Sequence, residues 1–285
     1  MGDMVIIDEQ VFTDIADAIR DKNGTEETYK PGEMAEAIAA AGYTLEDVCN
    51  NVFTGDIVFT GTKLIGGLFY NNKNITSFTG NSITNAMGDL TSIGSTVRTF
   101  SNCTNLENVS MTSLKDLYHT DYIFSGCTKL KTVNMDWKNM TRLGTGVFQS
   151  CSSLEITEFV LPKCTSNVYG YFITGNAYLT KFDIGGKASS VGNFAANAFQ
   201  NCSNLNIVII RDTSIRALAN INVFSGTPFA SGKAGGTLYV PSSLVSTYQS
   251  ATNWSTILGY STNSIVAIEG SQYENYYADG TSISS

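Results

Sequence analysis

The feature that most constrains the fold is a short apolar motif that recurs at nearly constant spacing. The residues from Phe100 to Val109 (FSNCTNLENV) are matched by those from Phe124 to Val133 (FSGCTKLKTV). Further copies begin at Phe148 and Phe199, and weaker ones at Phe69, Ile173 and Phe224. From Phe100 onward the copies lie 24 to 26 residues apart, and 31 residues separate Phe69 from Phe100. A unit this short cannot bury its own apolar face, so the units must stack and share a core.

Each copy also contains an alternating segment that predicts a short β-strand. Successive side chains of a strand point to opposite faces, so the apolar residues of each pair are expected inside. These inward pairs are Val109 and Met111, Val133 and Met135, Phe182 and Ile184, and Val208 and Ile210. The outward positions are Asn108, Ser110, Thr132, Asn134, Lys181, Asp183 and Arg211. The chain is therefore expected to be a β-rich solenoid with short helical or turn segments.

The pattern FxxCxxLxxVxI at this period resembles the BspA-like leucine-rich-repeat family, over about residues 49–270. The resemblance implies a leucine-rich-repeat solenoid at 49–236. It also implies a C-terminal cap at 237–270, because TLYVP from Thr237, followed by Tyr248, Trp254 and Ile265, is similar to the closing segment of such domains. Residues 271–285 remain as a polar tail. The first interval and the unit from Glu155 to Asn176 depart from the pattern, so the shape of those coils is left open.

Residues 1–48 differ from the rest in charge and in periodicity. They hold 12 acidic residues against three basic ones, a net charge of −9, whereas the whole chain carries −8. The apolar spacing from residue 12 to residue 42 predicts two short helices, with Asn23-Gly24 ending the first and Pro31 starting the second. A helix-turn-helix that reads DNA is the alternative, but this charge would repel phosphate. We therefore expect an acidic attachment segment and no nucleic-acid partner.

The sequence of residues 1–48 shows a second resemblance. Its sequence IADAIRDKNGTEETYKPGEMAEAIAAA, from Ile15 to Ala41, is similar to segments of tailed-phage structural proteins. That resemblance implies a virion or prophage tail component in which residues 1–48 contact other tail proteins. The repeats would then be an appended recognition module.

Catalytic and metal chemistry has little support in the sequence. The chain contains one histidine, His119, and no second group completes a catalytic set around it. We therefore expect no enzyme activity and no cofactor. Cys103, Cys127, Cys151 and Cys202 share one repeat position, at spacings that lack the paired ligands of structural zinc sites. We expect buried free thiols there, with disulfides as the alternative. Cys49 and Cys164 fall outside this row, and their state is left open.

Three aromatic residues are candidates for ligand contact. Trp137 follows a predicted strand in the polar stretch DWKN, where a large exposed ring could anchor a partner. Tyr169 and Tyr171 lie in the irregular unit and are similar candidates. For each of them half-buried packing is the favoured interpretation, and contact with a ligand is the alternative. Together with the outward strand positions, they form the predicted binding residues.

The leading functional hypothesis is a noncatalytic recognition protein of a phage or prophage tail. Stacked strands present an extended, rigid surface that suits recognition of a host cell-surface protein or glycan. The alternative is a bacterial cell-surface adhesin that binds host or matrix protein. The expected location is the virion or, in the alternative, the bacterial surface. The acidic first residues do not resemble an export signal, no apolar stretch suggests membrane insertion, and self-association is a further expectation.

Overall fold

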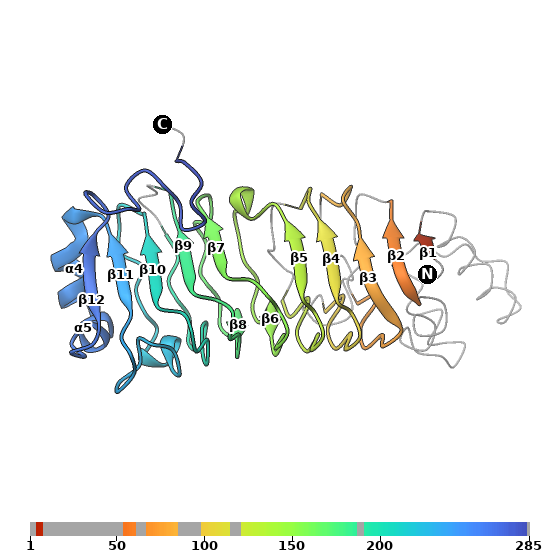
Figure 1. Ribbon diagram of the computed structural model, residues 1–285, viewed down its shortest axis with the longest axis horizontal. Helices are drawn as coiled ribbons and strands as arrows, with labels where there is room; N and C mark the ends of the chain where they lie inside the picture. The colour runs from red at the N-terminus through yellow and green to blue at the C-terminus, as the bar shows by residue number, and fades with distance from the viewer. Residues whose placement is uncertain are drawn as a thin grey trace, which may run out of the picture.

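A computed structural model describes residues 4–7, 54–60, 67–84, 98–114, 121–186 and 191–283. Within these residues, parallel strands from successive coils form two five-stranded sheets along one side of an elongated molecule (Figure 1). The first sheet contains β1 (Met4–Ile7), β2 (Gly55–Phe59), β3 (Ile75–Thr79), β4 (Asn108–Met111) and β5 (Thr132–Met135). The second contains β7 (Glu158–Leu161), β9 (Lys181–Ile184), β10 (Ile207–Ile210), β11 (Thr237–Val240) and β12 (Ser264–Ala267). This repeated, strand-dominated stack confirms the expected solenoid.

The strands form where the sequence alternates, and their apolar residues lie inside. Val109 pairs with Val133 and Met111 with Met135, so equivalent repeat positions are direct neighbours across the ladder. All eight residues of the inward pairs are buried, as the alternation predicts. Neighbouring strands of a sheet are about 4.8 Å apart, so one coil adds one layer to a continuous core.

The repeat phenylalanines form stacked interior rows. The rings of Phe100 and Phe124 are 5.5 Å apart and nearly parallel, and so are those of Phe124 and Phe148. Phe199 and Phe224 repeat this geometry at 5.5 Å. Between the two rows Ile173 takes the phenylalanine position and pairs with Phe148 across the ladder of β6 (Phe148–Gln149) and β8 (Ile173–Thr174). The predicted row of phenylalanines is confirmed, with an interruption at the irregular unit.

A left-handed backbone turn explains the residue two positions after each phenylalanine. This position has a positive φ in every described copy, and it is Asn71, Asn102, Gly126, Ser150, Gly175, Asn201 and Gly226. Glycine adopts positive φ without steric cost, and asparagine tolerates it better than most residues. At Gly126 an added Cβ would also lie 2.2 Å from the Asn102 side-chain oxygen of the preceding coil. The motif therefore encodes the turn as well as the core.

The cysteine position supplies a hydrogen-bond donor inside the core. The thiols of Cys127 and Cys151 donate to the carbonyl oxygens of Phe100 and Phe124 in the preceding coils, at 2.9 and 3.0 Å. In the copy that begins at Ile173, Asn176 takes the cysteine position, and its amide donates to the carbonyl of the leucine position in the preceding coil, Leu154, at 2.7 Å. All five described cysteines are free and buried, as expected for the repeat row. Cys164 is among them, whereas Cys49 lies outside the described residues.

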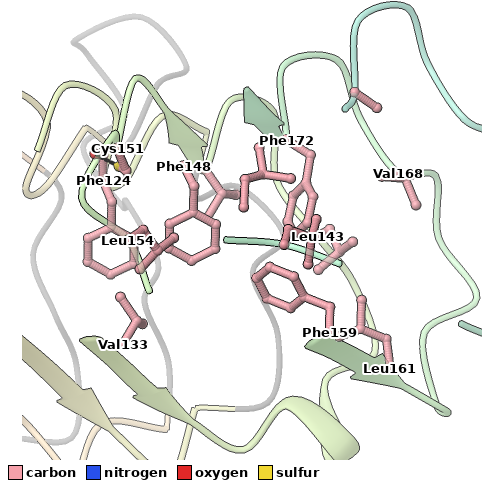
Figure 2. Packing of buried hydrophobic residues seen from close by; sticks show 14 of the residues in the cluster. Phe124, Val133, Leu143, Phe148, Cys151, Leu154, Phe159, Leu161, Val168 and Phe172 are labelled. Carbon is pink, nitrogen blue, oxygen red and sulfur yellow. Dashed lines mark hydrogen bonds between the residues drawn. The ribbon is translucent and has the colours of Figure 1, made fainter. Parts of the chain in front are cut away.

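The irregular unit coincides with the break between the two sheets. A short 3₁₀ helix, η1 (Trp137–Asn139), follows β5 at this point. The Trp137 ring packs edge-on against Phe148 and Phe159, with centroids 6.0 and 5.1 Å away. Figure 2 shows the surrounding core, where Phe159 reaches from β7 toward Phe148 and Phe172. An apolar cluster thus joins the two sheets where the strand ladder does not.

The residues beyond the last full repeat form a compact end. They comprise β11, η3 (Ser242–Leu244), α4 (Val245–Ser250), α5 (Trp254–Leu258) and β12. Trp254 is fully buried and donates from Nε1 to the Arg216 carbonyl at 2.7 Å. The backbone N–H of Arg216 donates to the Tyr248 hydroxyl at 3.0 Å. Burial raises the pKa of Tyr248 to about 12.

The beginning of the chain contributes a strand that the sequence did not predict. β1 pairs in parallel with β2, so part of the 1–48 segment extends the first sheet. The helices expected between residues 12 and 42 lie outside the described residues, and so does His119. At the other end, the tail runs back along the second sheet toward β7 (Figure 1).

Candidate binding surface

The outward side chains of β2 to β5 form two cross-strand rows. One row joins Asp56, Ser77, Asn108 and Thr132, and the other joins Val58, Thr79, Ser110 and Asn134, all at adjacent register positions. We call these eight residues the polar strand face. Except for Val58 they carry a hydroxyl, amide or carboxylate group, and each is exposed or half-buried. The rigid ladder beneath fixes their spacing.

Hydrogen bonds within the rows hold the side chains in place. The Thr132 hydroxyl donates to Asn108 Oδ1 at 2.7 Å, and the Asn134 amide donates to Ser110 Oγ at 3.4 Å. The Ser77 hydroxyl donates to Asp56 Oδ1 at 2.7 Å. Hydrogen bonds from Ser77 and Thr76 to its carboxylate lower the pKa of Asp56. Side chains held in this way lose less conformational freedom when a partner binds.

Besides the Asp56 carboxylate on the polar strand face, an ion pair lies beside the face. At the start of the strands, Lys131 Nζ lies 2.8 Å from Glu107 Oε2, and both side chains are well exposed. This contact lowers the pKa of Glu107 and raises that of Lys131. An exposed pair of this kind contributes little stability. The surface is thus suited to hydrogen-bonded recognition with balanced charge at its rim.

The predicted strand residues fall into two groups in the structure. Asn108, Ser110, Thr132 and Asn134 lie together on the polar strand face. Lys181 is half-buried on β9, where Nζ lies 3.4 Å from Glu158 Oε1.

Asp183 and Arg211 require a correction, because the sequence predicts them to be exposed. Asp183 is 1% exposed and Arg211 9%, and the tail covers both. Arg211 donates to the Asp183 carboxylate from Nε and Nη2 at 2.7 and 2.8 Å. Burial raises the pKa of Asp183, and the Arg211 guanidinium opposes that effect. As the chain stands, these two residues cannot meet a partner directly.

The aromatic candidates do not gather on the strand face. The favoured interpretation of Trp137 is confirmed, because its ring is half-buried and packs against the core, and the alternative of an exposed ring is wrong. Tyr169 is half-buried and Tyr171 is 37% exposed, and both lie just before β8, away from the two sheets. The Tyr171 hydroxyl accepts a hydrogen bond from the Asn197 amide at 3.0 Å.

Sequence reasoning missed the contact between the tail and the second sheet. Tyr273 and Ala278 of the tail are buried together with Val160 and Ile209, in an apolar cluster separate from the main core. The signal lay in β10, whose sequence IVII is apolar on both faces. A strand that is apolar on both faces needs a cover on each.

The residues that the structure describes contain no group of three or more potential metal-binding side chains that could hold an ion. No helix among them is long and apolar enough to cross a membrane.

The repeats that form the solenoid match the model of a known protein family. The family model for the BspA type leucine rich repeat region matches residues 62–206 in six copies. No curated protein matches the chain. The matched span begins before β3 and ends just before β10, so it includes β4 and β5 of the polar strand face and the break between the sheets.

Proposed function

Because the chain belongs to the BspA type leucine rich repeat family, we propose that it is a noncatalytic adhesion module that binds another protein at the polar strand face. The carrying observation is the pair of exposed or half-buried rows of hydroxyl and amide groups held at fixed spacing on β3 to β5. A preorganised polar surface favours binding because few side chains must be ordered on contact. The rim charges of Glu107 and Lys131 favour correct orientation of the partner.

Two settings for this module differ in the partner they need. In the first, the module belongs to a phage or prophage tail and meets a host cell-surface protein or glycan, while residues 1–48 contact other tail proteins. The resemblance of Ile15–Ala41 to tailed-phage structural proteins supports this setting. In the second, the module is a bacterial cell-surface adhesin for host or matrix protein, which the repeat family favours.

The test compares binding of the full chain to intact bacterial cells and to immobilised matrix proteins. A face variant, Asn108→Lys with Asn134→Lys, places two long cationic side chains on the polar strand face. The matched control, Ser203→Lys with Asn222→Lys, adds the same charge at two exposed positions outside the sheets. We expect the face variant to bind at least tenfold more weakly and the control to bind normally.

Either of two results would overturn the proposed surface: equal loss in both variants, or no loss in the face variant. Binding of the wild-type chain to bacterial cells alone supports the phage setting. Binding of the wild-type chain to matrix protein alone supports the adhesin setting. Circular dichroism of each variant checks that the solenoid stays folded.

A further inference from the structure

The second sheet already holds a bound chain segment, the tail. Residues 271–283 turn back after β12 and cross β11, β10, β9 and β7 near their carboxyl ends (Figure 1). The side chains beneath the tail occupy one register row, formed by Val160, Asp183, Ile209 and Tyr239. We call this row, with Arg211 and Lys181, the tail seat. It corresponds to the polar strand face of the first sheet.

The polar contacts of the tail seat are made to the main chain of the tail. Arg211 donates from Nη1 to the Tyr273 carbonyl and from Nη2 to the Tyr276 carbonyl, each at 2.9 Å. Lys181 Nζ donates to the Ala278 carbonyl at 3.2 Å. The backbone N–H of Ala278 donates to Asp183 Oδ2 at 2.9 Å. Contacts of this kind recognise an extended backbone rather than a particular sequence.

Side chains of the tail supply the specificity. Tyr273 is 5% exposed and packs edge-on against Tyr239, with ring centroids 4.8 Å apart. The Tyr277 ring, four residues later, lies against the Arg211 guanidinium at 5.1 Å and Lys138 Nζ at 5.7 Å. Two tyrosines at this spacing thus fix the position of the segment on the seat.

The seat is arranged by the solenoid itself. Arg211 is held by two hydrogen bonds from its guanidinium to Asp183, and both residues belong to the repeat stack rather than to the tail. Without a segment above it, the seat would expose this ion pair together with Val160 and Ile209. An exposed apolar patch with organised polar groups marks an interaction surface.

Outside the tail seat, the tail is also held by Lys138, whose Nζ lies 3.0 Å from Asp279 Oδ2. The tail follows Gly270, which has a φ of 79°, and its hydrogen bonds to the seat come from residues 273–278. A hollow of about 530 Å³ lies beside it, lined by Glu158, Lys181 and Tyr276, so this flank of the tail is not closely packed. Tyr276 itself is 52% exposed.

We propose that the tail seat is a docking site for an extended segment carrying tyrosines at the spacing of Tyr273 and Tyr277, and that the tail of a second copy of this chain docks there by exchange. Every contact made by the tail within one chain can be made between two chains. Exchange of identical segments is therefore a low-cost route to a dimer. This inference goes beyond the proposed function and does not use the polar strand face.

The first test uses a fluorescent synthetic peptide of residues 269–285 and a full chain whose own tail is loosened by Tyr273→Ala and Tyr277→Ala. We expect the loosened chain to bind the peptide at least tenfold more tightly than the wild-type chain. The wild-type tail competes at the high effective concentration of a tethered ligand. The chain with Tyr178→Ala, which removes an exposed tyrosine elsewhere, should behave like wild type.

A second peptide with the same two alanines separates recognition from nonspecific adhesion. It should not bind the loosened chain. Equal binding of the two peptides, or no binding of either, overturns the docking site. This readout does not depend on any further variant of the chain folding correctly. The face variant, Asn108→Lys with Asn134→Lys, should leave tail exchange unchanged, so failure here and failure of the proposed function are distinguishable.

The second test measures self-association of the wild-type chain by sedimentation over rising concentration. We expect dimers at high concentration, and a decrease of the dimer when excess wild-type tail peptide is added. The loosened chain should remain a monomer. If the peptide binds but the wild-type chain is a monomer at every concentration, or its dimer ignores the peptide, a second copy is not the occupant and the proposal is overturned.

Discussion

The polar strand face and the tail seat occupy equivalent register positions in two sheets that share one core. On β4 and β5 these positions hold Asn108, Ser110, Thr132 and Asn134, which meet solvent. On β7, β9 and β10 the row holds Val160, Asp183 and Ile209, which are buried under the tail. Outward residues of a solenoid strand therefore indicate whether that part of the ladder is open or covered. The inward residues carry no such information, because they are alike in both sheets.

The largest expected effect tests whether the two sheets share an equivalent core. Phe124→Ala and Phe199→Ala each remove a fully buried ring from a stacked row, one beside each sheet. Each substitution should lower the free energy of unfolding by about 3 to 5 kcal/mol, because a large buried side chain is replaced by a cavity. Chemical denaturation measures both. A near-neutral result at either position would contradict the stacked row.

A smaller difference in stability should distinguish the ion pair of the tail seat from the ion pair beside the polar strand face. Arg211→Ala leaves Asp183 buried without its partner, and should cost about 3 kcal/mol. Lys131→Ala removes the exposed pair with Glu107, and should change the stability by at most about 0.5 kcal/mol. Thermal and chemical unfolding of the two variants give the comparison. Similar costs would mean that the tail does not shield the ion pair as the structure indicates.

The core and the strands could be predicted from the sequence because the residues that form them recur in each repeat. Val109, Val133 and Val208 recur at one position, and recurrence distinguishes a stacked fold from chance. The contact between Asp183 and Ala278 joins residues 95 positions apart and occurs only once, so no periodic signal marks it. The polar neighbours of Trp137 left an exposed ring open as an alternative, and no repeat position marks the place where its ring packs, because the repeat is interrupted there.

Substitution of Trp137 tests how the two sheets are joined. Trp137→Ala should reduce the free energy of unfolding by about 2 kcal/mol, because the half-buried ring packs against Phe148 and Phe159 at the break between the sheets. Tyr171→Ala, at a 37% exposed ring, is the control and should cost less than about 1 kcal/mol. The measurement is chemical denaturation, with cell binding recorded in parallel. Loss of binding without loss of stability would restore Trp137 as a direct anchor.

The smallest expected effect concerns two aspartates, one on each face. Hydrogen bonds from Ser77 and Thr76 lower the pKa of Asp56 on the open face, whereas burial under the tail raises the pKa of Asp183 despite Arg211. The signs of their contributions to stability are therefore opposite. The stabilisation from Asp56 is present above its unfolded pKa and is lost as the pH falls through its lowered folded value. The contribution from Asp183 favours folding at low pH and is lost as the pH rises through its raised value.

Titration of the aspartate carboxyl carbons by NMR measures both pKa values in the folded chain. Asp56 should titrate below its ordinary pKa of 3.8 and Asp183 above it. Ser77→Ala should move only Asp56 toward 3.8, because one hydrogen bond to its carboxylate is removed. Loosening the tail with Tyr273→Ala and Tyr277→Ala should lower the pKa of Asp183 and leave Asp56 unchanged, because water then reaches the buried carboxylate while Arg211 stays beside it. If the pKa of Asp183 stays the same when the tail is loosened, burial under the tail is not the cause of the difference between the tail seat and the polar strand face.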